Sequence, residues 1–132
     1  MGVTVEEREA QRTARRMRLD KALGDVVRTL RSMGAIRVMV FGSYVEGPLR
    51  RWSDLDVLAV MPSTRSGAQW FRDVHAAIDT DVPVDIVTFT EQELKAKRAT
   101  SSFVRRALRT GRVVYEQGQE GRGEELVQAG AG

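Results

Sequence analysis

Three aspartates near the middle of the chain have the types and spacing that point most directly to chemistry. Asp54 and Asp56 lie two positions apart in a Ser-Asp-Leu-Asp segment at the start of an expected strand, so both side chains point to one face. Two adjacent ionised carboxylates repel each other and need compensating cations. Because oxygen ligands without His or Cys favour Mg²⁺ or Mn²⁺, the pair is a candidate metal site; a solvated turn is the structural alternative.

Asp85 is the third candidate, and it lies in the apolar, mostly β-branched stretch Val82–Val87. A charge in such a strand is costly unless it is paired or binds a metal. If this strand lies beside the strand that begins near Asp54, Asp85 joins Asp54 and Asp56 around one pair of ions. An edge-strand carboxylate that faces solvent is the alternative interpretation.

Gly42 and Ser43 follow the apolar run Ala35–Phe41 and form a candidate phosphate-binding turn. Glycine lets the backbone approach a ligand closely, and free N–H groups at the start of a helix suit phosphate. Ser43 adds a hydroxyl donor. A Gly-Ser pair is also common in strand-to-helix turns that bind no ligand. The prediction of phosphate binding therefore depends on the aspartates that follow it.

The apolar spacing and the helix caps predict the elements that must position these residues. A capping box at Thr4–Glu7 begins a helix that ends at Gly34, and its first half is so polar that we expect it to be exposed or frayed. The other predicted elements are strands at 35–41, 55–61 and 82–89, helices at 66–78, from 91 and at 102–109, and a short strand or extended stretch at 112–115. This pattern predicts an α/β or α+β fold with one small sheet.

Composition limits the class of protein. A chain of 132 residues with 42% hydrophobic and 30% charged residues is typical of one soluble globular domain. It has no Cys and only one His, His75, which excludes disulfides, cysteine nucleophiles and multi-histidine zinc sites. The chain shows no apolar signal core and no stretch near the ~20 residues of a membrane span, so we expect a cytoplasmic protein without membrane contact.

The charges are distributed unevenly along the chain. Residues 8–37 carry nine Arg or Lys against three acids, whereas residues 46–85 carry seven acids against four Arg. Basic flanks around an aspartate cluster are expected where metal ions and polyphosphate meet. A plain nucleic-acid binder that uses the Arg-rich N-terminal helix would explain the flanks but not the aspartates, so we do not expect a nucleic-acid partner.

Gly42-Ser43, then Ser53–Asp56, then an apolar strand that bears Asp85 together resemble the DNA polymerase β-type nucleotidyltransferase superfamily. The chain is most similar to its minimal nucleotidyltransferase domains, a group that contains antitoxins paired with HEPN toxins. The resemblance covers roughly residues 36–115. It implies a small mixed sheet flanked by helices. We expect the nucleotidyltransferase core at 35–115 and an Arg-rich helical segment at 1–34 packed on it. The tail at 116–132 is rich in Gly and poor in large apolar residues, so we expect it to be mobile.

The same resemblance implies roles for the candidate residues. Gly42 and Ser43 would hold the nucleotide's phosphates, Asp54 and Asp56 would bind two Mg²⁺ ions, and Asp85 would bind the catalytic ion and help to activate the attacking hydroxyl. Mn²⁺ would serve as well, and ATP would be the substrate. The reaction would be transfer of a nucleoside monophosphate, AMP, to a hydroxyl.

The acceptor is inferred from size and from the resemblance. Relatives that modify aminoglycosides add a helical domain, which 132 residues cannot accommodate. We therefore expect a protein adenylyltransferase that modifies a partner protein, a HEPN-type toxin. The alternatives are a non-catalytic antitoxin module that only binds its partner, and a small-molecule nucleotidyltransferase completed by oligomerisation; a homo-oligomer is compatible with the sequence.

Two positions depart from the family's pattern. Many relatives carry a basic residue where this chain has Glu46, just before Gly47. Arg50 and Arg51 are predicted to supply the missing positive charge to the triphosphate. Trp52 could stack on a base or pack into the domain, and packing is the interpretation we favour.

Overall fold

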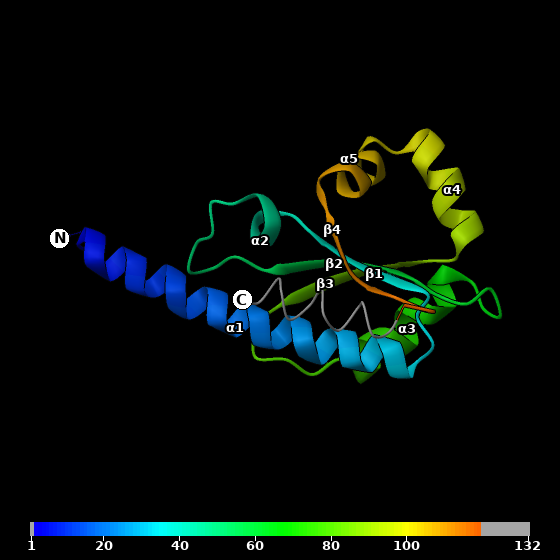
Figure 1. Ribbon diagram of the computed structural model, residues 1–132, viewed down its shortest axis with the longest axis horizontal. Coiled ribbons are helices and arrows are strands. Elements are labelled where there is room, and N and C mark those ends of the chain that lie inside the picture. Colours follow the sequence, from blue (N-terminus) through cyan, green and yellow to red (C-terminus); the bar gives the residue numbers. More distant parts are fainter. Residues whose placement is uncertain (1, 120–132) are drawn as a thin grey trace.

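One four-stranded sheet with helices on both faces organises the part of the chain that the computed structural model describes, residues 2–119 (Figure 1). Within the predicted tail, residues 120–132 lie outside this part. Along the chain the elements are α1 (Val5–Ser32), β1 (Arg37–Phe41), α2 (Ser43–Glu46), β2 (Leu55–Val60), α3 (Gly67–Ala77), β3 (Val84–Phe89), α4 (Glu91–Thr100), α5 (Ser102–Thr110) and β4 (Arg112–Glu116). None of the described helices is both long and apolar enough to cross a membrane.

The sheet has the order β3-β2-β1-β4. β1 runs antiparallel to both β2 and β4, while β2 and β3 are parallel and joined through α3. The predicted small mixed sheet flanked by helices is therefore confirmed. The stretch at 112–115, which the sequence left open between strand and extended chain, forms an edge strand beside β1.

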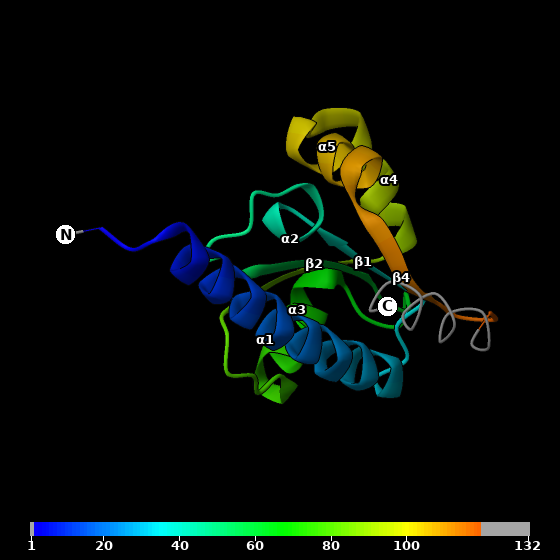
Figure 2. The same ribbon diagram turned by 60° about the vertical axis from the view of Figure 1, so that its left-hand side comes forward.

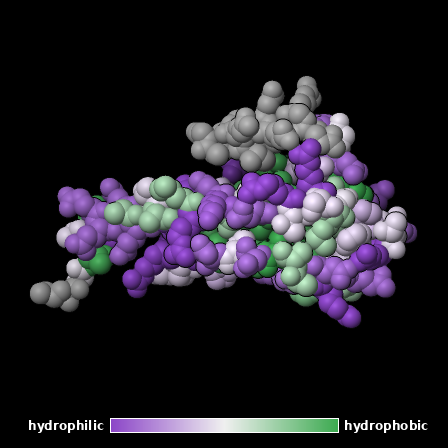
Figure 3. All heavy atoms as spheres, turned by 90° about the horizontal axis from the view of Figure 1, so that it is seen from below, coloured by the Kyte–Doolittle hydropathy of each residue, from purple (hydrophilic) through white to green (hydrophobic). Residues whose placement is uncertain are grey.

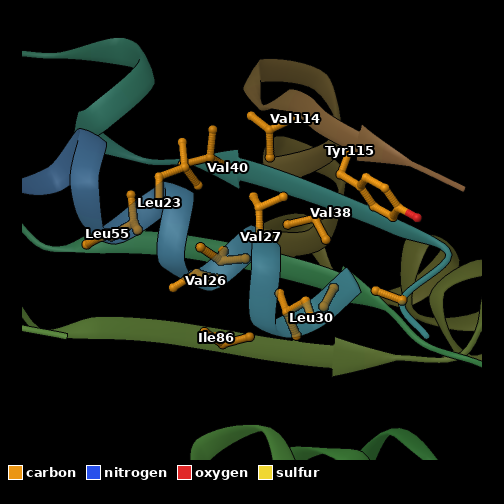
Figure 4. Packing of buried hydrophobic residues seen from close by; sticks show 14 of the residues in the cluster. Leu23, Val26, Val27, Leu30, Val38, Val40, Leu55, Ile86, Val114 and Tyr115 are labelled. Atoms are coloured by element: carbon orange, nitrogen blue, oxygen red, sulfur yellow. The ribbon is translucent and has the colours of Figure 1, made fainter. Parts of the chain in front are cut away.

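Helix α1 begins at the predicted capping box, in which the Glu7 backbone N–H donates to Thr4 Oγ1 at 3.1 Å. Its buried residues start only at Leu19, so the first half of the helix is exposed but not frayed. Figure 1 shows this half projecting past the end of the sheet. The second half packs its apolar side chains against the strands, as Figure 4 shows for Val26 and Leu30 beside Val38 and Ile86. Each such buried side chain contributes about 1.5–3 kcal/mol to folding.

The opposite face of the sheet is covered by α4 and α5, whereas α1 and α3 cover the first face (Figure 2). Leu58 and Val60 of β2 pack there with Leu94 of α4 and Val104 of α5. Side chains alternate across a strand, so Asp56 shares this face with Leu58 and Val60 but lies at the opposite end of β2 from Val60.

Candidate active site

The parallel pairing of β2 and β3 brings two of the predicted carboxylates side by side. Asp56 and Asp85 are direct register partners, and Asp54 stands one residue before the start of β2. Neighbouring strands lie about 4.7–4.9 Å apart, so the Asp56 and Asp85 side chains leave the same face of the sheet next to each other. The structure thus brings together the aspartates that the sequence singled out, and their chemical roles stay predictions.

Electrostatic repulsion links the three aspartates. Burial raises the pKa of the half-buried Asp56, and the negative charges of Asp85 and, less strongly, Asp54 raise this pKa further. Asp54 and Asp85 are both exposed. Hard oxygen donors that repel one another fit a divalent cation such as Mg²⁺ in their chemistry. No group of three or more His, Cys, Asp or Glu among the described residues is arranged to hold a metal ion.

Gly42 places the predicted phosphate-binding turn directly against this carboxylate pair. It follows β1 with a φ of +76°, a conformation that favours glycine. A Cβ atom at this position would lie 2.3 Å from Oδ2 of Asp56. The register of β1 with β2 agrees, because Phe41 pairs with Asp56. The Gly-Ser turn and the aspartates therefore form one site, with α2 beginning at Ser43.

Contacts with α1 hold the short helix α2 in place. The Tyr44 hydroxyl donates a hydrogen bond to Asp20, and the Arg16 guanidinium lies 5.1 Å from the centre of the Tyr44 ring. Burial, together with this hydrogen bond and the charge of Asp20, raises the pKa of Tyr44 to about 12. The sequence did not indicate this role of Asp20, because its hydrogen-bond partner Tyr44 is 24 positions away.

The expectation that Trp52 packs into the domain is wrong, since 64% of this residue is exposed. The turn before β2 buries Ser53 instead. Ser53 Oγ accepts from the Arg50 backbone N–H at 2.9 Å, and its carbonyl accepts from Arg15 Nε at 2.9 Å. With Ser53 fixed inside, the turn directs Trp52 outward, where the Arg50 guanidinium lies 5.7 Å from the centre of its ring.

Arg50 and Arg51 are exposed and line a groove with the first half of α1. Their predicted contact with a triphosphate stays a prediction. Glu46, the other departure from the family's pattern, forms an ion pair with Arg106 of α5 at 3.2 Å. Sequence reasoning missed Arg106, because nothing local indicates that two residues 60 positions apart bridge α2 and α5.

Comparison with known protein families decides what class of protein carries this arrangement. The family model of the nucleotidyltransferase domain matches residues 21–110, which is more than half of the chain. The chain belongs to this family. The matched region thus includes part of α1 together with β1, β2 and β3 and ends just before β4, whereas the resemblance read from the sequence began only at about residue 36.

One solved structure shares the fold of this nucleotidyltransferase domain, and two toxin–antitoxin structures are weaker matches. A Sulfolobus solfataricus protein proposed to be a nucleotidyltransferase is 17% identical and has a TM-score of 0.61, with 83% of this chain and 91% of that chain covered. A toxin–antitoxin structure with AMP-PNP is 21% identical, with a TM-score of 0.47 and coverages of 80% and 81%. A mutant of the MntA-HpeT toxin–antitoxin is 20% identical, with a TM-score of 0.46 and coverages of 81% and 80%. No curated protein matches the sequence significantly.

Two substitutions in the Gly-Ser turn test its predicted role in ATP binding. One introduces a steric clash, and the other removes a single hydrogen-bond donor. In Gly42→Val, the new side chain clashes with Asp56 at a positive φ, so we expect ATP affinity to fall below detection in calorimetry. Ser43→Ala removes the hydroxyl that is predicted to donate to a charged phosphate, a hydrogen bond worth about 1.5–3 kcal/mol, so ATP affinity should fall about 10- to 150-fold.

Gly118→Val is the matched control for backbone strain. Gly118 also has a positive φ, +85°, but nothing lies within 4 Å of an added Cβ. It follows β4 at the end where Glu116 pairs with Arg37, far along β1 from Gly42. This control should bind ATP as the wild type does. If Gly42→Val and Ser43→Ala also bound ATP with wild-type affinity, the nucleotide would have to bind elsewhere.

Proposed function

We propose that this nucleotidyltransferase domain transfers AMP from ATP, with Mg²⁺ or Mn²⁺, to a side-chain hydroxyl of a partner protein. The partner in this proposal is a HEPN-type toxin, which the domain neutralises as its antitoxin. One observation carries the catalytic part of the proposal: Asp56 lies beside Asp85 and directly over Gly42. This juxtaposition supports a site where the phosphates of a nucleotide meet paired carboxylates.

Each residue of the site has a distinct role in the proposed reaction. The Gly42–Ser43 turn binds the phosphates through backbone N–H groups and the Ser43 hydroxyl. Asp54, Asp56 and Asp85 would hold two Mg²⁺ ions, which when bound supply positive charge that acidifies the acceptor hydroxyl and neutralises the leaving pyrophosphate. In this reaction Asp85 would accept the proton of the acceptor hydroxyl, whose oxygen forms a bond to the α-phosphorus as the bond to pyrophosphate breaks.

Exposure of the site supports a macromolecular acceptor. Asp54 and Asp85 are exposed on the surface, so a hydroxyl carried by another protein can approach them without a preformed small-molecule pocket. The assignment to a HEPN-type toxin rests on the resemblance of the Gly-Ser and Ser-Asp-Leu-Asp segments to the antitoxin group. The small-molecule alternative gains no support from this open geometry.

The decisive experiment incubates the purified protein with ATP labelled at the α-phosphate, Mg²⁺ and the product of the neighbouring gene. We expect label on a hydroxyl side chain of that product, and loss of labelling when EDTA removes the divalent cation. ATP labelled at the γ-phosphate is the control and should leave no label. A stable complex that forms without any transfer of label would contradict the enzymatic proposal and favour the non-catalytic antitoxin module.

A further inference from the structure

A basic groove lies between the first half of α1 and the loop that joins α2 to β2. It measures about 360 Å³, and we refer to it as the α1–loop groove. Arg8 and Arg12 line it from α1, one helical turn apart, while Arg50 and Arg51 line it from the loop. None of the described residues that line the groove is acidic. Figure 3, seen from the α1 side, shows hydrophilic side chains dominating the projecting part of this helix.

These four arginines lack ionic partners within the described part of the chain. Other surface arginines there are paired, for example Arg65 with Asp73 and Arg37 with Glu91. Arg8, Arg12, Arg50 and Arg51 take part in no ion pair among residues 2–119. Four like charges gathered around one concave surface create a positive potential that attracts an anionic partner.

Apolar groups complete the groove between the charges. Leu49 and Pro48 line it together with Val3, which is 41% exposed, and with the exposed Trp52 ring. Trp and Arg are among the residue types that most often dominate the binding energy of protein–protein interfaces, so an exposed Trp flanked by Arg fits a protein-binding surface. Aliphatic side chains offer little to phosphate or to nucleotide bases, but they suit the apolar side chains of a polypeptide.

The groove lies close to Asp54 of the candidate active site. Trp52 precedes Asp54 by two residues, so their Cα atoms are at most about 7 Å apart. The turn between them is fixed by Ser53, which is buried and bonded both to Arg50 and to Arg15 of α1. A polypeptide seated in the groove therefore presents its neighbouring residues to the aspartates.

We propose that the α1–loop groove binds an acidic segment of the acceptor protein that also carries an apolar or aromatic side chain. This inference rests on the proposed function, because it names the feature by which the acceptor is recognised. Asp and Glu of the segment pair with Arg8 and Arg12, and its apolar side chain packs against Trp52 and Val3. The groove thus selects the acceptor, while the aspartates and the Gly-Ser turn act on the nucleotide.

The test selects displayed random short peptides on the wild-type protein and then measures the best peptide by fluorescence anisotropy. We expect enriched peptides to combine clustered Asp or Glu with Leu or an aromatic residue. The Arg8→Glu/Arg12→Glu variant should bind about tenfold more weakly or worse, because two attractions become repulsions. Trp52→Ala should lose several-fold, and added salt should weaken wild-type binding. Arg72→Glu on the exposed surface of α3 is the control for a charge reversal outside the groove and should bind normally.

Parallel readouts separate failure of this inference from failure of the proposed function. Peptides without acidic enrichment, or equal affinity in wild type and Arg8→Glu/Arg12→Glu, would overturn the inference. So would tight binding of a single-stranded oligouridylate that the same variants abolish, which would make the groove a nucleic-acid site. Calorimetry should show unchanged MgATP affinity in Arg8→Glu/Arg12→Glu and in Arg72→Glu. Absent label transfer in a wild-type protein that binds acidic peptides would contradict the proposed function alone.

Discussion

Replacing Asp56 with Asn is expected to lower nucleotidyl transfer at least ~10³-fold, equivalent to about 4 kcal/mol of activation free energy. Asp56 is the half-buried carboxylate at the centre of the site, with Asp85 beside it and Gly42 below it. In the proposed mechanism it contributes to both divalent cations, so no neighbouring group can replace its charge. Single-turnover transfer from α-labelled ATP to the partner protein measures the loss.

The same substitution is expected to stabilise the protein when divalent cations are removed. The raised pKa means that the folded state retains the Asp56 proton at pH values where the unfolded chain has released it. The free energy of unfolding therefore falls as pH rises from the ordinary Asp pKa of about 3.9 through the raised value, and it stays lower above that range. Asn at position 56 carries no charge, so the variant lacks both this pH-dependent decrease in the free energy of unfolding and the repulsion with Asp85 and Asp54.

Urea denaturation in EDTA near pH 7 and near pH 4 measures this effect. The stability gain of Asp56→Asn should be present near neutral pH and should shrink in acid, because the raised pKa lets folded Asp56 take up its proton as the pH falls. Asp73→Asn, an exposed substitution on α3 paired with Arg65, is the control and should not show this gain. A wild-type protein that shows no thermal shift with MgATP, while Asp56→Asn behaves identically, would count against a site for metal and nucleotide.

Local signals explain why much of the fold could be predicted. Helices α1 and α4 begin where the sequence predicts them, and each begins at a capping box, at Thr4 and at Thr90, formed by residues three positions apart. The apolar runs that became β1, β2 and β3 stand out because buried strands require them. The placement of Asp85 beside Asp56 followed from one further assumption, that β2 and β3 are neighbours, and their parallel pairing confirms it.

Long-range contacts explain what the sequence could not indicate. The outward position of Trp52 depends on Arg15 of α1, which fixes Ser53 from 38 positions away. The ion pair of Glu46 with Arg106 joins residues 60 positions apart. The α1–loop groove likewise forms only when the exposed half of α1 lies beside the loop before β2. These contacts have no periodicity or motif, so they depend on the tertiary arrangement alone.

Replacing Asp85 with Asn is expected to separate nucleotide binding from transfer. In the proposed mechanism Asp54 and Asp56 suffice for the cation that accompanies the nucleotide, whereas Asp85 serves only the activation of the acceptor hydroxyl. Asp85→Asn should therefore keep MgATP affinity within several-fold of wild type in calorimetry. The transfer rate should fall at least ~10³-fold, because the acceptor loses the group that draws its proton. Asp81→Asn, in the exposed turn before β3, is the matched control and should transfer normally.

This variant also decides whether catalysis or binding neutralises the partner. Asp85 is on the sheet and not in the α1–loop groove, so Asp85→Asn should still form the complex with the partner protein. If the partner is a toxin, as proposed, cells that express it together with this variant should not be protected, although complex formation and nucleotide binding persist. Protection equal to that of the wild-type protein would mean that binding alone neutralises the toxin. In that case the carboxylates could still be chemically competent, but the function of the protein would lie in its binding surface, and the enzymatic proposal would be wrong for its role in the cell.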